Sequence, residues 1–487
     1  MSSSDSDIKA LEPYPSLLQR LPALLEEYAE LTIRHPKHFG VWNNYGSLLI
    51  RAGRIQQAIE ALRIAASLRP HSPFAQSNFL LSLNYDENLD AQAFARAHRG
   101  FADLFPPPEA AFSKDRDPDR VLRVGLLSSA FRSNAITFFF PGMLYPKPDI
   151  EMYCYSATRF PDDVTTRFAE ECPRWRDISL CSDEEADAII RKDQIDILIE
   201  RGGHAGDNRL PLLARKPAPI TGTGCDYLAT VGVPGLDFRI TDSIIDPPGA
   251  EDLYPETLIR LPETAYCYTA PAYAPEVNGL PALNNGVVTF ACFHRLEKVS
   301  AASLRLWAAV MRRVPGSRIL LHHVYEGQPS VSPEFKLPIE QRFLALGVTA
   351  DRLIWKGALP PDESMRLYQQ TDIALDCWPY AGVTTTCQAL YMGVPVVTMT
   401  GDRPMSRYGA SVLAAAGLER WIVTTPEEYV ESVTKLASDL PGLARLRTEL
   451  RPMMQRSTLT NEAAYASRLA TAYREVWKEW CYSNAAD

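Results

Sequence analysis

The sequence predicts an α/β protein with two parallel-sheet lobes that follow an all-α arm. Residues 1–105 show helical spacing and contain no convincing strand. From Arg120 onward, short apolar runs such as RVLRVGLLSS, IEMYCYSA and IDILIE alternate with helical runs, and this alternation pauses at residues 271–286 before it starts again. Strand–helix alternation is typical of parallel sheets joined by right-handed crossovers.

Composition and charge favour a cytoplasmic protein. The 487 residues are too many for one core, and the net charge of −9 argues against a nucleic-acid partner. The nine cysteines are scattered, and no CxxC pair or zinc-type His/Cys spacing occurs, so we expect reduced thiols. The N-terminus lacks the pattern of a signal peptide, and no apolar run approaches the roughly 20 residues of a membrane span.

The arm has the spacing of tetratricopeptide repeats. One repeat is strongly marked, and small residues at Gly46 and Ala58 predict two helices in close approach; its signature positions are Trp42, Tyr45, Gly46, Leu49, Ala58, Leu62, Ala65 and Pro70. Asn44 and Asn78 lie one 34-residue repeat period apart. They are either two solvated asparagines or a ladder of amides that binds the backbone of an extended acceptor peptide.

The predicted domain order has five parts. A Pro-rich, charged segment follows the arm, and a second Pro-rich segment separates the two lobes. The expected bounds are the repeat arm 1–105, a linker 106–119, an N-terminal lobe 120–270, a linker 271–286 and a C-terminal lobe 287–487.

The stretch CWPYAGVTTTCQALYMGVPVV, residues 377–397, is the strongest candidate for a binding site. It follows the apolar run DIALD, and Thr384, Thr385 and Thr386 open a helical pattern that ends at Gly393. Free N–H groups and partial positive charge at a helix start can hold a phosphate without a metal. The alternative is ordinary threonine capping of a buried helix.

A second loop supports the phosphate interpretation. CFHRLEK, residues 292–298, follows the first apolar run of the same lobe and places Arg295 and Lys298 after a strand. Ligands of open α/β sheets bind at the carboxyl ends of strands, where the strand order reverses. A lysine on one such loop and a threonine-rich helix start on another form a better phosphate site than either alone.

These motifs resemble the bacterial branch of the O-GlcNAc transferase and SPINDLY-like family, in which tetratricopeptide repeats precede a GT-B glycosyltransferase of two Rossmann-like lobes. The resemblance covers most of the chain, from about Phe39. It rests on the repeat and on RVGLLSSAF, GGHAGDNRLPLLARKPAPI, LDFRITDSIIDPP, LYPETLIRLP, CFHRLEK, WPYAGVTTTCQALYMGVPVVTM and SRYGASVLAAAGL.

The resemblance implies a metal-independent, inverting transfer of a sugar from a nucleotide-sugar donor, UDP-GlcNAc or a variant, to Ser or Thr of a protein. It implies that Lys298 contacts the diphosphate, that Thr384 and Thr385 hold phosphate oxygens, and that Arg295 flanks the donor sugar. Asp187 aligns with an aspartate proposed as the catalytic base. No cofactor is implied, and the acceptor of such a bacterial enzyme would be flagellin or another surface protein bound through the arm.

Several positions depart from the family pattern. Asn134 stands where a His follows the first strand, Gln388 replaces an acidic residue that grips the nucleotide ribose, and Val383 precedes the threonines. Asn134 and His204 are candidates for contact with the acceptor. The departures leave an alternative function, that of a non-catalytic repeat-plus-lobe module that binds a protein partner. A third hypothesis is a glycosyltransferase that acts on a small molecule or a lipid.

Overall fold

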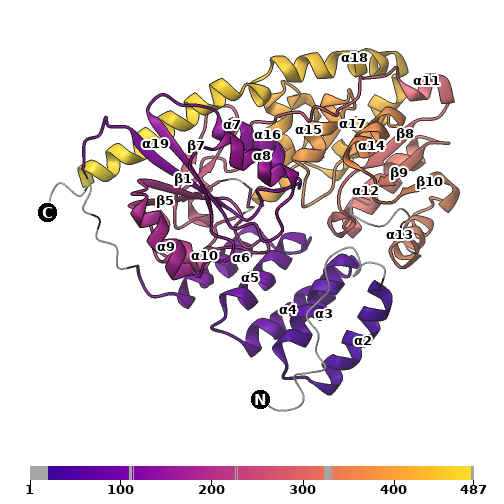
Figure 1. The fold of residues 1–487 in the computed structure, drawn as a ribbon. Coiled ribbons are helices and arrows are strands. Elements are labelled where there is room, and N and C mark those ends of the chain that lie inside the picture. The colour runs from indigo at the N-terminus through magenta and orange to yellow at the C-terminus, as the bar shows by residue number, and fades with distance from the viewer. Residues whose placement is uncertain are drawn as a thin grey trace. The chain divides into compact units, whose positions relative to one another are not determined.

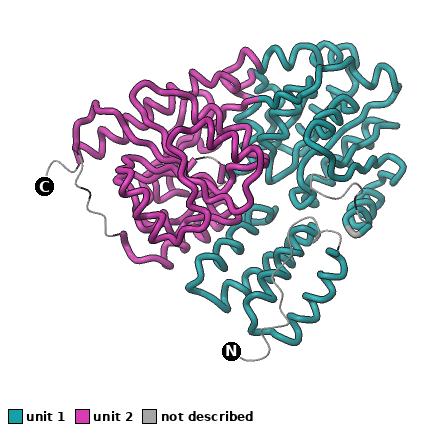
Figure 2. The backbone as a smooth tube through the Cα atoms, in the orientation of Figure 1, with its two compact units in different colours: residues 1–89, 270–413, 417–454 teal, residues 90–269, 414–416, 455–487 magenta. Residues whose placement is uncertain are grey.

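A computed structural model describes residues 20–108, 112, 115–224, 226–227, 229–322, 331 and 333–483. The chain divides into two compact units, which are coloured separately in Figure 2. Unit 1 comprises residues 1–89, 270–413 and 417–454, and unit 2 comprises residues 90–269, 414–416 and 455–487. Each unit contains one parallel sheet, so the two α/β lobes predicted from the sequence are confirmed.

The repeat arm is built of helices, as its spacing predicts. Its elements are α2 (Leu21–Arg34), α3 (Phe39–Arg51), α4 (Ile55–Leu68), α5 (Pro73–Ser82) and the short helix η1 (Leu83–Tyr85). A Cβ atom added to Gly46 would lie 2.5 Å from Cγ of Leu62, so glycine is required where α3 packs against α4. The close-packed helix pair expected from Gly46 and Ala58 is therefore present.

The helix that follows the arm belongs to unit 2. The sequence prediction placed residues up to 105 in the arm, whereas the compact units part between Leu89 and Asp90. Helix α6 (Ala91–Arg99) and the short η2 (Gly100–Leu104) come next. His98 of α6 is fully buried, and its Nε2 lies 2.8 Å from the hydroxyl of Tyr227, which ties the helix to unit 2.

The sheet of unit 2 has seven parallel strands in the order β3-β2-β1-β4-β5-β6-β7. Strands β1, β2 and β4 match apolar runs read from the sequence, and their burial on both faces explains those runs. The strands are β1 (Leu122–Ser128), β2 (Ile150–Ser156), β3 (Trp175–Asp177), β4 (Ile197–Glu200), β5 (Ile220–Thr223), β6 (Phe238–Thr241) and β7 (Thr257–Arg260). The helices among them are α7 (Phe140–Leu144), α8 (Asp163–Glu171), α9 (Asp183–Lys192) and α10 (Leu210–Ala214).

The last helix, α19 (Glu462–Ser483), completes the core of unit 2. Its stripe of Tyr465, Leu469, Tyr473 and Trp477 is buried in one cluster with side chains of β1, as the four-residue spacing predicts. In Figure 1 this helix is drawn in yellow.

The sheet of unit 1 has six parallel strands in the order β10-β9-β8-β11-β12-β13. The strands are β8 (Thr289–Cys292), β9 (Arg318–His322), β10 (Leu353–Lys356), β11 (Ile373–Leu375), β12 (Val396–Met399) and β13 (Ile422–Val423). The helices are α11 (Pro281–Asn285), α12 (Ala301–Arg313), α13 (Pro333–Ala345), α14 (Pro361–Arg366), α15 (Thr384–Tyr391), α16 (Tyr408–Ala415), α17 (Pro426–Ser438) and α18 (Leu440–Arg456), and the short helix η5 (Leu296–Lys298) follows β8. The strand order reverses between β8 and β11, and this switch point is where an open α/β sheet binds its ligand.

Candidate functional site

The two sequence motifs for phosphate binding meet at the switch point of unit 1. The loop after β8 carries His294, Arg295 and Lys298, and the loop after β11 runs from Asp376 into helix α15. Neighbouring parallel strands end at the same edge of the sheet, so both loops lie at that edge. The structure thus brings together the side chains that the sequence assigned to the donor.

Helix α15 begins without a capping side chain. Its N-cap residue is Val383, which makes no side-chain capping hydrogen bond, and Thr384 is the first helical residue. Ordinary threonine capping therefore does not explain the threonine run. A Cβ atom added to Gly382 would lie 2.3 Å from Oγ1 of Thr385 and 2.4 Å from Cε1 of His294, so only glycine lets the loop pass this point.

Asp376 holds the loop that leads into this helix. Its Oδ1 accepts hydrogen bonds from the backbone N–H of Cys377 at 2.9 Å and of Gly382 at 2.8 Å. Its Oδ2 accepts from the hydroxyl of Thr398 on β12 at 2.5 Å. The carboxylate is almost fully buried, so it acts as the internal anchor of the loop.

His294 connects Asp376 to the helix start. Its Nε2 lies 3.1 Å from Oδ1 of Asp376, and its Nδ1 lies 3.3 Å from Oγ1 of Thr385. The imidazole is 5% exposed and is therefore held by these two partners. His294 and Asp376 were not predicted from the sequence, although each directly follows the apolar run of a strand, and that position was the available signal.

Lys298 carries an amine whose pKa lies close to neutral pH. Its Nζ lies 3.5 Å from the ring centroid of Tyr380, which is a cation–π contact. Burial, followed by repulsion from Arg295, lowers the pKa of Lys298 to about 7, while Cys377, Asp376 and Glu297 act in the opposite direction. An anion at this edge would favour the charged ammonium.

The end of the repeat arm is fastened to these loops, and we call residues 83–87 the arm-end segment. Arg295 donates from Nη2 to the hydroxyl of Tyr85 at 3.2 Å, and the Tyr85 ring lies 5.6 Å from that of Tyr380. Arg403 donates to the carbonyl of Asp86 at 2.5 Å, and Glu87 accepts from the backbone N–H of Ala302 at 2.9 Å. The arm-end segment is thus part of the surroundings of Lys298.

Two further donor candidates lie on α15. Thr384 is 9% exposed at the first helical position, and Gln388 lies one turn further along and is half-buried. The structure thus places Thr384, Thr385 and Gln388 on one short helix.

The two arm asparagines are linked inside the arm. The amide of Asn44 donates to the hydroxyl of Tyr28 at 3.1 Å, and the amide of Asn78 donates to Oδ1 of Asn43 at 2.7 Å. Both asparagines are half-buried, so each keeps some contact with solvent. Their role in binding an acceptor stays a prediction.

The remaining candidates belong to unit 2 and are engaged in its own structure. Asp187 lies 2.7 Å from Nε of Arg191 and 3.5 Å from Nε of Arg215, which are ion pairs that compete with a role as a base. The amide of Asn134 donates to two loop carbonyls at 2.8 and 2.7 Å, and its oxygen accepts from the N–H of Ile136. These contacts lend no support to a catalytic or acceptor role for either residue.

His204 needs a correction. The prediction that it contacts an acceptor required an accessible imidazole, whereas the ring is 0% exposed. Its Nε2 lies 3.1 Å from the carbonyl of Val231, and it packs against the rings of His98, Phe101 and Tyr227. His98 on α6 and Phe101 on η2 thus cover the imidazole.

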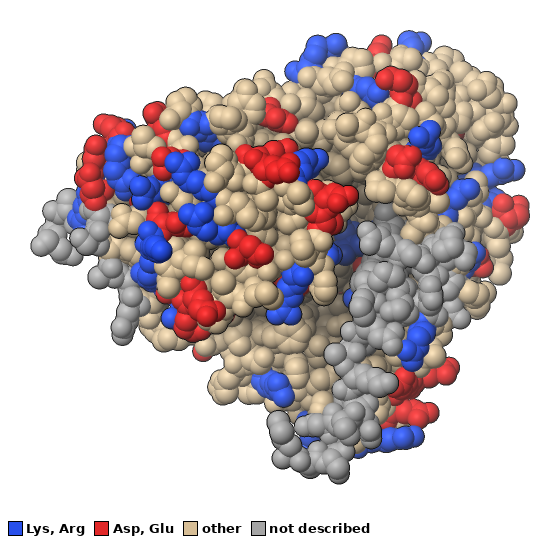
Figure 3. All heavy atoms as spheres, in the orientation of Figure 1, with Lys and Arg blue, Asp and Glu red and all other residues tan. Residues whose placement is uncertain are grey.

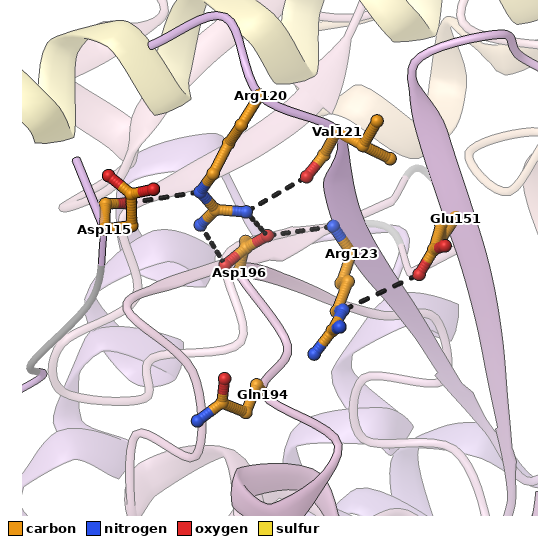
Figure 4. Close-up of a pocket in the computed structure, with 7 residues that line it drawn as sticks. All are labelled: Asp115, Arg120, Val121, Arg123, Glu151, Gln194 and Asp196. Carbon is orange, nitrogen blue, oxygen red and sulfur yellow. Dashed lines mark hydrogen bonds and ion pairs between the residues drawn. The ribbon is translucent and has the colours of Figure 1, made fainter. Parts of the chain in front are cut away.

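A hollow of about 390 Å³ lies in unit 2, beside the amino ends of strands β1, β2 and β4 (Figure 4). Arg120 forms two hydrogen bonds to Asp196, at 2.8 and 2.7 Å, and Arg123 lies 3.6 Å from Glu151. These charges neutralise one another, and the hollow contains none of the candidate site residues. It is best explained as a surface depression lined by ion pairs.

The described residues contain no group of three or more His, Cys, Asp or Glu side chains arranged to hold a metal ion. Within the same ranges, no helix is long and apolar enough to cross a bilayer. On the face drawn in Figure 3, basic and acidic side chains are intermixed, and neither sign forms a broad patch.

Comparisons with known proteins agree with this geometry. Two parallel sheets, one in each unit, and the similarity to a solved O-GlcNAc transferase given below identify the GT-B fold. The pattern of the family described as "Glycosyl transferase family 41" matches residues 104–270 and 277–469. The chain belongs to glycosyl transferase family 41.

Individual relatives fit the same assignment. The chain is 35% identical over 422 residues to the "Probable UDP-N-acetylglucosamine--peptide N-acetylglucosaminyltransferase SPINDLY" of Petunia hybrida, which covers 85% of this chain and 45% of the relative. The protein of the same description in Arabidopsis thaliana is 36% identical, over 85% of this chain and 46% of the relative. The chain thus spans about half the length of these curated relatives.

Solved structures give the same fold. A mutant O-GlcNAc transferase of Thermobaculum terrenum is similar at a TM-score of 0.89 and 30% identity, covering 96% of this chain and 89% of that one. Sucrose-phosphate synthase of Thermosynechococcus elongatus has a TM-score of 0.50 at 13% identity, over 74% of this chain and 100% of that one, which supports the fold alone.

Proposed function

We propose that this protein is a metal-independent, inverting glycosyltransferase that moves a sugar from a nucleotide-sugar donor to Ser or Thr of a polypeptide. The observation that carries the proposal is the meeting of Lys298 and the uncapped start of α15 at one switch point in a family 41 chain. The named relatives are described as acting with UDP-N-acetylglucosamine on peptides, so UDP-GlcNAc or a related sugar nucleotide is the proposed donor.

The proposed chemistry uses positive charge in place of a metal. The acceptor hydroxyl oxygen forms a bond to the anomeric carbon as the sugar–phosphate bond breaks, and the hydroxyl proton passes to a base or to solvent. The electron pair of the broken bond stays on the diphosphate, so negative charge grows beside Lys298 and the N–H groups of the α15 start. Preorganised donors aimed at a developing charge are among the largest contributions to catalysis. The helix dipole adds to the same effect.

The acceptor is proposed to be a polypeptide in the cytoplasm that the repeat arm binds. Asn44 and Asn78 are half-buried and separated by one repeat, and each amide nitrogen has a second hydrogen beyond the one that it donates inside the arm, so we propose that they contact an extended backbone. Flagellin or another surface protein modified before export is the class of acceptor suggested by resemblance to bacterial members.

A thermal-shift screen tests the donor assignment. The full chain is heated with UDP, GDP, CMP and their sugar conjugates, without metal and with EDTA. A ligand present at 100 times its Kd stabilises the folded state by about 2.7 kcal/mol, so one nucleotide should raise Tm clearly above the others. No response to any nucleotide would refute the donor site.

Gln388 favours a second candidate function, in which the protein binds a protein partner and transfers no sugar. The resemblance places an acidic ribose contact at this position, and the amide found here is a weaker partner for two vicinal hydroxyls. If wild type shows no transfer and Gln388→Glu gains it, the chain is an attenuated enzyme. A scaffold would respond to neither this change nor Asn134→His.

A further inference from the structure

The contacts of Asp376 determine where one hydrogen of His294 lies. Asp376 accepts from the backbone N–H groups of Cys377 and Gly382 and from the hydroxyl of Thr398, so it acts as an acceptor throughout. The short contact between its Oδ1 and Nε2 of His294 therefore requires a hydrogen on Nε2. Protonation of His294 can therefore only add a hydrogen to Nδ1.

The hydrogen-bonding role of the Thr385 hydroxyl depends on the protonation state of His294. When His294 is neutral, its Nδ1 is an acceptor and takes the hydroxyl hydrogen of Thr385, so the threonine oxygen offers only lone pairs to a ligand. When His294 is protonated, Nδ1–H donates to Thr385 Oγ1. The hydroxyl hydrogen is then released and can rotate toward a phosphate oxygen.

We propose that His294 takes up a proton when a nucleoside diphosphate or its sugar ester binds beside Thr385, and so converts Thr385 from an acceptor to a donor. This inference rests on the proposed function, because it places the phosphate at the start of α15. The proton comes from solvent, and only hydrogen bonds change. His294 is thereby a positioning residue that acts on the ligand through Thr385.

The surroundings of His294 favour a cation once an anion is present. Asp376 faces Nε2, and the hydroxyls of Thr385 on α15 and Thr398 on β12 are the polar neighbours from adjoining elements. Further titratable groups around Asp376 are Lys298, Cys377 and Tyr429, with Cys292 beside Cys377, and Arg295, Glu297 and Tyr380 lie around Lys298. A buried imidazolium between a carboxylate and a diphosphate would have a negative partner on each side.

Lys298 provides a competing source of proton uptake, and the experiment has to separate the two. Burial lowers the pKa of Lys298 to about 7, so this amine also gains protons when an anion binds. Lys298→Arg keeps the positive charge and removes the titration, because a guanidinium stays protonated. Uptake that survives in Lys298→Arg must come from another group.

The test is calorimetry of the full chain with UDP, or with the nucleotide that the screen selects, at pH 7.5 in buffers that differ in ionisation enthalpy. The variation of heat with buffer gives the number of protons taken up. Lys298→Arg should retain uptake of up to about one proton, and adding His294→Asn or Thr385→Val should abolish it. The matched control is Thr386→Val, whose wild-type hydroxyl donates to the carbonyl of Gly382 at 3.0 Å and which should leave the uptake unchanged.

A second measurement covers variants that bind too weakly for calorimetry. Nitrogen-15 spectra of the imidazoles in wild type distinguish a neutral ring from a protonated one, and His294→Asn identifies the signal among the eight histidines. Saturating nucleotide should shift the His294 signal to the protonated form. A ring that stays neutral, or uptake unaffected by His294→Asn, overturns the inference while nucleotide binding persists. Failure of wild type to bind any nucleotide overturns the proposed function as well.

Discussion

The carboxyl edges of the two sheets differ in what their polar side chains do. In unit 1, Lys298 is half-buried beside Tyr380, and the hydroxyl of Thr385 is reached by His294 at the start of a helix without a cap. In unit 2, His204 is fully buried, and Glu200 accepts hydrogen bonds from the backbone N–H groups of Gly202 and Gly203. The same strand arrangement thus carries the candidate donor site at one edge and side chains bonded to their own loop at the other.

Ionisable groups with shifted pKa values at the two edges show the same contrast. Burial raises the pKa of Glu200 to about 7, yet its oxygens are occupied by the backbone of its own loop. Lys298 has a pKa lowered to about 7, and its Nζ faces the ring of Tyr380 rather than the backbone of its own loop. A perturbed pKa alone therefore does not mark a functional site, and the partners of the group decide.

The largest expected effect is a loss of stability in acid, centred on unit 2. Burial lowers the pKa of His98 to about 4 and that of His204 well below its usual value. Because the unfolded chain titrates near 6.5, their contribution is complete above that pH and is lost as the pH falls toward 4. For His98 alone the loss is roughly 3 kcal/mol.

Urea unfolding at pH 7 and pH 5 measures the part of this loss that falls between those two values, about 2 kcal/mol for His98. His98→Asn should unfold more easily at pH 7 and depend less on pH than wild type does. His322 on β9 is the unit 1 counterpart, since burial lowers its pKa to about 4 as well. If His98→Asn retained the full pH dependence, the buried histidine pair would not be the acid-sensitive element of unit 2.

The next effect compares a lysine from each unit. Lys298→Met should weaken nucleotide binding by about 1.5–3 kcal/mol, or roughly tenfold to a hundredfold, because a charge-assisted contact to the diphosphate is lost. Lys147 in unit 2 donates to the carbonyls of Met143 and Tyr145 at 2.6 and 2.9 Å. Lys147→Met should therefore lower stability and leave nucleotide affinity unchanged.

Calorimetry and urea unfolding on both lysine variants separate the two roles. A Lys298→Met protein that binds nucleotide as tightly as wild type would remove Lys298 from the donor site. Equal loss of affinity in both variants would indicate a general folding defect.

A smaller effect concerns Gln388 on α15. Gln388→Glu should tighten ribonucleotide binding by roughly 1 kcal/mol, because a carboxylate accepts from two vicinal ribose hydroxyls and an amide oxygen offers less. The deoxyribose form of the same nucleotide is the control, since it has only one of the two hydroxyls. If wild type and the Gln388→Glu variant bound both forms with equal affinity, this side chain would lie away from the ribose.

Much of the fold could be predicted because buried parallel strands are continuous apolar runs. β1, β2 and β4 were read in this way, whereas β5 (Ile220–Thr223) and β7 (Thr257–Arg260) were not, since short strands with threonine and arginine lack that signal. At the site, Lys298 and the threonine run were found by motif. The His294–Asp376 pair was not, because the pairing depends on two strands that are distant in sequence and adjacent in the sheet.

The smallest expected effect tests whether the arm-end segment contributes to the donor site. The hydroxyl of Tyr85 accepts from Arg295, and the Tyr85 ring supports Tyr380, which in turn faces Lys298. Tyr85→Phe removes one hydrogen bond to a charged, partly exposed group and should weaken nucleotide binding by about 0.5–1 kcal/mol with little change in Tm. Tyr28→Phe is the matched control, because it removes an arm hydroxyl that Asn44 contacts and that lies in α2. Nucleotide titration of both variants should show a lower affinity for Tyr85→Phe only. Equal affinity in the two proteins would mean that the arm-end segment merely packs against unit 1, and the functional contrast between the sheets would then rest on the loops after β8 and β11 alone.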